Sequence, residues 1–445
     1  MSPFVASASH RNRRRWLCWG LLFAGSVSLC AVEPQSIDLP TALKLAGAKN
    51  LDVEIAREKV NEARAVSDSA RARFFPWIAP SIVVRRHEEN VQDAGGRILD
   101  ADKQSLSAGI ALNAQLDLGE TYYQTLIAKQ VVKSNEATLA GRQREATFRA
   151  AAGYFDLVRA RAAVIAAEEA ARIIGRHAGQ IATTAEAGIT FQGDVTRVRA
   201  ARERSELALS RARTEQRIAG IRLAEVLRLD PSVELTPVDS DLAPLSGLVA
   251  ADDLGGLIAH AFASRPELDE MAARMQAARL GRRAATRAPL MPVIGAQASI
   301  GGLGGGPAGS TLTRDFDTSS DLSLGVSWRV GPGGLFDRNR QREMGARERQ
   351  SELEQEKMRD FIRRQVVEHY TRLRALAGQI DLVERALKAA DQTAKLSRER
   401  REMGVSAALE DLQAEDELAQ ARRDFLVTIA DYNLAQYALW YVVGK

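Results

Sequence analysis

The sequence of 445 residues predicts an α+β membrane protein in which long helices carry four β-strands per chain. Composition is the first reason: 27% of the residues are charged and only 5% are aromatic, which is typical of long helices rather than compact α/β cores. The second is a pair of proline-free stretches, 81–230 and 333–445, because proline costs about 3 kcal/mol inside a helix. The third is a change, in two shorter stretches, to the period-two alternation of strands.

Residues 1–30 are predicted to be an export signal. Four arginines within 11–15 precede an apolar stretch, 16–29, that is too short to span a membrane as a helix. Ser28 and Cys30 fit the −3 and −1 positions of a signal-peptidase site, and Cys30 as a lipoprotein cysteine is the alternative. Without these four arginines the 61 basic residues become 57, equal to the 57 acidic residues, so no nucleic-acid partner is expected.

The sequence gives no sign of an enzyme, a cofactor or a metal site. Both cysteines, Cys18 and Cys30, belong to the export signal, so no disulfide or thiolate metal site is expected in the remaining chain. No later stretch of 18 residues is apolar and uncharged, so no transmembrane helix is predicted. The histidines are scattered along the sequence and none has a second ligand at metal-binding spacing. They are His10, His87, His177, His260 and His369.

Two very long helices are predicted. One covers residues 121–187, and at 1.5 Å per residue it is roughly 100 Å long, too long for one globule. The other has apolar positions in alternating steps of three and four, which need another helix to cover them. His369 is interpreted as part of this seam. The seam consists of Ile362, Val366, His369, Leu373, Leu376, Ile380, Val383, Leu387, Ala390 and Ala394.

Period-two alternation predicts two β-hairpins with strands of roughly ten residues, the length that crosses a bilayer when tilted. The predicted strands are residues 77–86, 105–118, 293–300 and 321–330. The intervening segments, 88–102 and 301–320, are polar and glycine-rich and are predicted to be loops. Within the second, residues 301–306 lack the Lys-Ser/Thr of a phosphate-binding loop and are interpreted as a flexible external loop.

The order of these features repeats along the chain. Pro76 and Pro292, Gly188 and Gly404, and Asp194 and Glu410 are each separated by 216 residues. The sequence therefore predicts an internal two-fold repeat of helix, hairpin, long helix, turn and helix.

Four strands cannot close a membrane barrel, and open edges in lipid would leave backbone groups unpaired at several kcal/mol each. Two chains would supply eight strands and three chains twelve. Eight strands are filled by side chains, whereas twelve leave a lumen. We therefore expect a homotrimer with a 12-stranded β-barrel in outer-membrane lipid, continued by a long α-helical barrel.

Over about residues 37–441 the order and spacing resemble the TolC family of outer-membrane efflux and secretion ducts. The resemblance is carried by the helix starts at Asn50 and Arg265-Pro266-Glu267-Leu268, by the strand entries at Pro76 and Pro292, and by the two glycine turns. It implies a channel in the cell outer membrane that extends into the periplasm. It also implies two partners, a periplasmic adaptor protein and an inner-membrane pump of the RND type.

Two alternatives remain open. A type I secretion or drug-efflux duct would have the same fold. An exported coiled-coil structural or adhesion protein belongs to a different class, and it would use the hairpins as ordinary periplasmic sheets.

A shorter resemblance concerns the cargo. Leu335-Phe336-Asp337-Arg338-Asn339 is similar to the heavy-metal cation-efflux branch of the TolC family. The preceding Gly331-Pro332-Gly333-Gly334 departs from the apolar run usual there. A helix N-cap at Asp337 or Asn339 is the structural alternative.

The resemblance also implies periplasmic tips and a gate. The tips that would contact the adaptor are Gly188-Ile189-Thr190 and Gly404-Val405-Ser406. Beyond them the family narrows to a gate lined by acidic side chains with i, i+3 spacing. The matching positions are Glu410 and Gln413 in the second repeat and Asp194 and Arg197 in the first. Asp411 would replace Glu410 if the register shifted, and an acid that stabilises a helix N-terminus is the alternative role for Glu410.

Together these features divide the chain into seven segments. Residues 1–30 are the signal peptide, 31–76 the N-terminal and first short helices, 77–118 the first hairpin, 119–230 the periplasmic helices of the first repeat, 231–291 the equatorial linker and short helices, 292–331 the second hairpin, and 332–445 the periplasmic helices of the second repeat.

Overall fold

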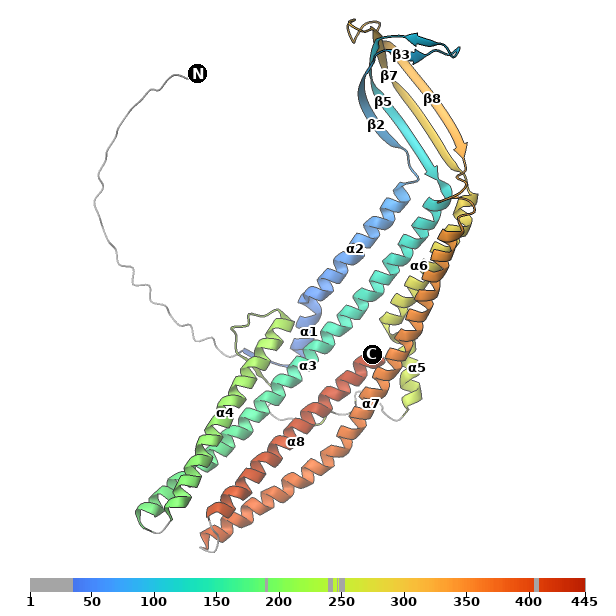
Figure 1. Cartoon of the computed structure of the whole chain (residues 1–445). Coiled ribbons are helices and arrows are strands. Elements are labelled where there is room, and N and C mark those ends of the chain that lie inside the picture. Colours follow the sequence, from blue (N-terminus) through green and yellow to red (C-terminus); the bar gives the residue numbers. More distant parts are fainter. Residues whose placement is uncertain are drawn as a thin grey trace, which may run out of the picture.

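The protein is an elongated bundle of long helices with a curved four-stranded sheet at one end (Figure 1). The computed structural model describes residues 35–188, 191–238, 243–245, 247, 253–403 and 408–444. The predicted signal peptide lies outside these residues. None of the helices that are described combines the length and the apolar character needed to cross a membrane.

The first half of the chain forms two short helices, a hairpin and two long helices. In chain order its elements are β1 (Gln35–Ile37), α1 (Leu39–Lys49), α2 (Leu51–Ala72), β2 (Trp77–His87), β3 (Asn90–Gln92), β4 (Ile98–Asp100), β5 (Lys103–Asp117), α3 (Leu118–Glu186) and α4 (Gln192–Leu227). The long helix predicted over 121–187 is thereby confirmed as α3.

The second half follows the same order. Its elements are β6 (Leu235–Pro237), α5 (Leu254–Ser264), α6 (Pro266–Arg287), the 3₁₀ turn η1 (Ala288–Leu290), β7 (Val293–Pro307), β8 (Asp317–Ser327), α7 (Arg338–Glu402) and α8 (Ala408–Val443). The helix lengths of the two halves agree closely. Helices α2 and α6 have 22 residues each, α4 and α8 have 36 each, and α3 and α7 have 69 and 65.

Local side chains explain where several helices begin. The Asn50 side chain accepts a hydrogen bond from the backbone N–H of Asp52 at 2.9 Å and so caps α2. Asp117 caps α3 in the same way, through the backbone N–H of Glu120 at 2.9 Å. Pro266 is the first residue of α6. An N–H at this position has no acceptor within the helix, so proline, which lacks one, is tolerated there. The two helix starts predicted from Asn50 and Arg265-Pro266 therefore rest on ordinary capping chemistry.

The strands form one antiparallel sheet in the order β2-β5-β7-β8, so β5 and β7 join the two hairpins. Ile110 of β5 lies between Pro80 of β2 and Ile300 of β7, and this register gathers the apolar side chains on one face. The opposite face carries mainly serine and glycine. On the apolar face are Ile78, Ile82, Val84, Leu106, Leu112, Ile294, Leu322, Leu324 and Val326. The alternation predicted from the sequence is confirmed.

The predicted loop over residues 301–320 is too long, because β8 already begins at Asp317, and the prediction of a flexible loop over residues 301–306 is wrong. These glycines continue β7, which runs to Pro307 and pairs with the whole of β5. Gly301 lies opposite Gly109, and a Cβ on Gly301 would stand 2.6 Å from the Gly109 Cα. The two backbones approach too closely for side chains, so the glycines serve strand pairing. The other predicted loop, 88–102, contains the small hairpin β3–β4.

Among the described residues, two large hydrophobic cores and two smaller clusters hold the helical part together. One large core lies among α1, α3, α4, β1 and β6, and the other among α5, α6, α7 and α8. Ile362 and Val366 of the predicted seam are fully buried in the second core. His369 is half-buried in the same helix, and burial lowers the pKa of its imidazole. A neutral seam histidine is consistent with the interpretation from the sequence.

Candidate functional site

The predicted tips lie at the end of the bundle remote from the sheet, where α3 leads into α4 and α7 into α8 (Figure 1). Gly188 has a φ of +73°, and its N–H donates to the Ala185 carbonyl at 3.0 Å. This left-handed turn ends α3 as glycine allows. The other five tip residues, Ile189, Thr190, Gly404, Val405 and Ser406, lie outside the described part of the chain.

The gate residues of the second repeat lie on an exposed face at the start of α8. Glu410 stands in the first turn, and its Oε1 accepts a hydrogen bond from Arg400 Nη1 of α7 at 2.8 Å. Gln413 follows three residues later and is also exposed. Glu410 is therefore placed to act both as a surface acid and as a link between α7 and α8.

The equivalent residues of the first repeat form a different contact. Asp194 lies in the first turn of α4, and its Oδ1 pairs with Arg197 Nη1 of the same helix at 3.4 Å. Asp194 thus shares its position with Glu410 but makes its ion pair along one helix rather than between two.

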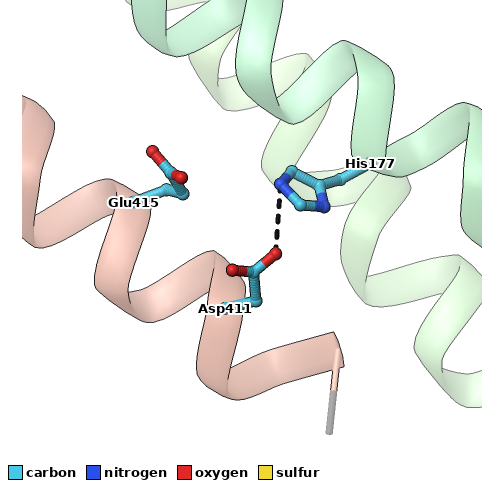
Figure 2. A group of neighbouring side chains, drawn as sticks. All are labelled: His177, Asp411 and Glu415. Carbon is cyan, nitrogen blue, oxygen red and sulfur yellow. Dashed lines mark ion pairs between the residues drawn. The ribbon is translucent and has the colours of Figure 1, made fainter. Parts of the chain in front are cut away.

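Asp411, the alternative to Glu410, belongs to a buried cluster instead. Its side chain is 0% exposed, and its Oδ2 lies 3.2 Å from Nε2 of His177 on α3. Glu415 lies one turn farther along α8 and is also buried, with its Oε1 accepting from Arg398 Nε of α7 at 2.9 Å. Figure 2 shows His177 facing Asp411 across the gap between the two helices. We call His177, Asp411 and Glu415 the α3–α8 cluster.

Burial is the largest influence on Glu415 and raises the pKa of its carboxyl group. The neighbouring Asp411 raises it further. Three arginines act in the opposite direction, namely Arg398, Arg422 and Arg176. Glu415 is thus a buried carboxyl group among arginines, unlike the exposed Glu410 nearby.

Sequence reasoning missed this cluster because His177 is 234 residues before Asp411 in the sequence. Asp411 and Glu415 share a face of α8, four residues apart, and this spacing was the one available signal. His177 reaches them only because α3 and α8 pack together.

The pentapeptide 335–339 caps α7. Asp337 Oδ1 accepts from the Arg340 N–H at 2.9 Å, and Oδ2 accepts from the Gly333 N–H at 2.8 Å. These backbone donors lower the pKa of the Asp337 carboxyl. Of the two N-cap candidates, Asp337 rather than Asn339 makes the capping contact. Phe336 beside it is 80% exposed.

Comparison with known proteins gives both a family match and a fold match. The family described as "Outer membrane efflux protein" matches residues 42–227 and 257–445. Protein CyaE of Bordetella pertussis is 37% identical over 91 residues, which are 20% of this chain and 19% of that protein. The chain thus aligns with only about a fifth of the length of this relative.

Two solved structures are similar over nearly the whole chain. A membrane protein from Pseudomonas aeruginosa superposes with a TM-score of 0.78 at 19% identity, covering 91% of this chain and 93% of that one. The Campylobacter jejuni CmeC outer membrane channel superposes with a TM-score of 0.79 at 14% identity, covering 91% and 85%. These likenesses establish the fold.

Proposed function

This chain belongs to the outer membrane efflux protein family, and from that premise we propose that three copies form a channel carrying substrate from the periplasm to the exterior. The protein is located in the outer membrane and extends into the periplasm, as the resemblance to the TolC family implies. Its family and fold are those of channels and not of enzymes. An exported structural or adhesion protein does not fit this family.

The observation that carries the proposal is the incomplete sheet. It has only four strands, and within the described residues its outer strands β2 and β8 each pair on one side only. Its apolar face is exposed, with Ile82 77%, Leu322 83% and Leu324 76% accessible. Unpaired edges are costly in lipid, so β8 of one copy would pair with β2 of the next. Three copies would close twelve strands around a lumen.

The long helices would continue this channel across the periplasm. At 1.5 Å per residue, α3 and α7 are each roughly 100 Å long, and three copies of them would form the proposed α-helical barrel. The agreement in order and length between the halves supports an origin by internal duplication. On this proposal the sheet is the outer-membrane segment, and residues 231–291 form the equatorial part.

The partners follow from the two ends of the tube. We assign the α3–α4 and α7–α8 tips to contact with a periplasmic adaptor, which would connect the channel to an inner-membrane pump of the RND type. The tips are the part of the molecule farthest from the membrane sheet (Figure 1), which is where such a contact has to form.

For the cargo, heavy-metal cations are our first candidate and drugs or secreted proteins the second. The pentapeptide 335–339 supports the first, although the capping contacts of Asp337 give this residue a structural role at the start of α7 as well. A deletion strain tests the proposal directly.

The deletion strain should become more sensitive to the pumped compound and regain resistance when the full-length gene is returned. A panel of divalent metal salts and a panel of drugs would be compared in parallel by growth inhibition. Sensitivity to metals alone supports the metal cargo, and sensitivity to drugs alone supports the alternative. A protein recovered only as a soluble periplasmic monomer would refute the channel itself.

Replacing Glu410 by alanine should raise the single-channel conductance and weaken the cation preference in planar bilayers. In a trimer the change removes three exposed carboxylates from the proposed gate, and a ring of acids favours cations. It also removes the 2.8 Å contact with Arg400 that links α8 to α7. Both effects favour a wider opening.

The matched control for this variant is Glu206→Ala. Glu206 is exposed on α4 and pairs with Arg202 of the same helix at the same 2.8 Å, so the control removes an exposed carboxylate and an ion pair of the same length away from the start of α8. It should leave conductance unchanged. If Glu410→Ala also leaves both conductance and cation preference unchanged, Glu410 is not a gate residue.

A further inference from the structure

The α3–α8 cluster contains the ligand types of a transition-metal site. In the part of the chain that the structure describes, it is the one group of His, Asp, Glu or Cys whose potential ligand atoms converge from three or more residues. One imidazole nitrogen and two carboxylate oxygens lie within 4.8 Å of one another. Divalent transition metals, zinc above all, accept this donor set.

The distances suit a small ion. Around zinc, bonds of about 2.0–2.2 Å place neighbouring ligand atoms roughly 3.3 Å apart. His177 Nε2 and Asp411 Oδ2 are already separated by 3.2 Å. Only Glu415 has to move closer, by rotation of its side chain on the next turn of α8 (Figure 2).

Glu415 also offers an oxygen for this purpose. Its Oε1 is held by Arg398, whereas its Oε2 is buried and accepts no hydrogen bond from the described residues. A buried carboxylate oxygen without a donor is costly unless something positive satisfies it. A cation between Glu415 and His177 would do so while Arg398 keeps the other oxygen.

A cavity of about 240 Å³ gives access to the cluster. His177 and Glu415 both line it, and Asp411 contacts His177. The cavity wall also carries arginines, and these oppose a cation: Arg172, Arg176, Arg398 and Arg422. The affinity is therefore set by competition between the metal and these guanidinium groups.

We propose that His177, Asp411 and Glu415 bind one divalent transition-metal cation per chain, with zinc as the reference ion. The three residues supply one nitrogen and two oxygen ligands, and a fourth position remains open to water from the cavity. The ion would join α8 to α3, and so tie the α7–α8 hairpin to the α3–α4 hairpin near the proposed tips. Metal binding would then restrain movement between these hairpins.

Zinc binding to the purified full-length trimer in detergent tests this site. After treatment with a chelator, the protein would be titrated with zinc chloride against a chromophoric competitor. We expect one tight site per chain, and X-ray absorption should show imidazole nitrogen and oxygen ligands at roughly 2.0–2.2 Å without sulfur. Zinc should also raise the thermal midpoint of unfolding.

Four variants distinguish this site from surface binding. His177→Gln and Glu415→Gln should each weaken zinc binding at least about 10-fold. Arg398→Gln should strengthen it roughly 10-fold, because the competing positive charge is removed. His369→Gln is the control, since it removes a half-buried histidine of α7 outside the cluster. It should leave binding unchanged.

Several results would overturn the proposal. One is equal zinc affinity in the wild type and in Glu415→Gln, measured on variants whose circular dichroism shows folded helices. Another is weaker binding in Arg398→Gln, which would mean that Arg398 braces the cluster and that no metal competes with it. Should His177→Gln fail to fold, Glu415→Gln and Arg398→Gln decide the question on their own.

Discussion

A Gly301→Val variant should leave almost no assembled trimer in the outer membrane and should abolish resistance to the pumped compound. Gly301 lies at the junction of the two hairpins, directly opposite Gly109. A Cβ at this position would stand 2.6 Å from the Gly109 Cα, closer than non-bonded carbons approach. Because the obstructing atoms are backbone, no side-chain rotation relieves the clash, and β5 and β7 must separate.

The size of the effect follows from overpacking. Extra methyl groups in a filled site cost about 1–3 kcal/mol, and valine adds three carbons. Since each 1.4 kcal/mol is a factor of ten, we expect the trimer to decrease at least about 10-fold. Heat-modifiable, SDS-resistant trimer in outer-membrane fractions is the measurement.

Gly295→Val is the matched control for this prediction. Gly295 is in the same strand and on the same face as Gly301, but a Cβ there would meet nothing within 4 Å. The control should assemble normally. If both variants assemble equally well, the close approach of β5 and β7 does not require glycine, and the account of the 301–306 glycines is wrong.

These glycines also mark where sequence reasoning reached its limit for the fold. Alternating apolar residues reveal a strand because their side chains share one face of the sheet, and this signal predicted the strands over 105–118 and 321–330 and which of their side chains share a face. Five of residues 301–306 are glycines, which have no side chains and therefore show no alternation. Because glycine is common in turns and loops, this segment was predicted to be a loop. Their strand conformation is imposed by pairing with β5, which is a tertiary effect.

The candidate site also has one part that the sequence could predict and one part that it could not. Glu410 and Gln413 were assigned to the gate from the resemblance to the TolC family, and the structure places both on an exposed face of α8. The α3–α8 cluster could not be predicted, since His177 meets Asp411 only after two distant helices pack. A pattern within one helix reports which face is buried, but not which charged group lies opposite.

Replacing His177 by leucine should loosen the attachment of α8 to α3 by about 3 kcal/mol, because a buried carboxylate loses a close polar partner. Asp411 is 0% exposed and cannot turn to solvent without moving α8. Hydrogen exchange of the amides around Asp411 and Glu415 should therefore become more than 100-fold faster, since 2.7 kcal/mol is a factor of 100. In bilayers the variant should open more often.

The double variant His177→Leu with Asp411→Leu gives the decisive comparison. Replacing both partners of a buried charged pair by apolar groups of similar size is often neutral, so exchange should return to within about tenfold of the wild type. His369→Leu, the control on α7, should not accelerate exchange in α8. If the double variant is as unstable as the single one, His177 and Asp411 stabilise α8 through separate contacts. The opening of this end of the molecule would then depend on something other than their pairing.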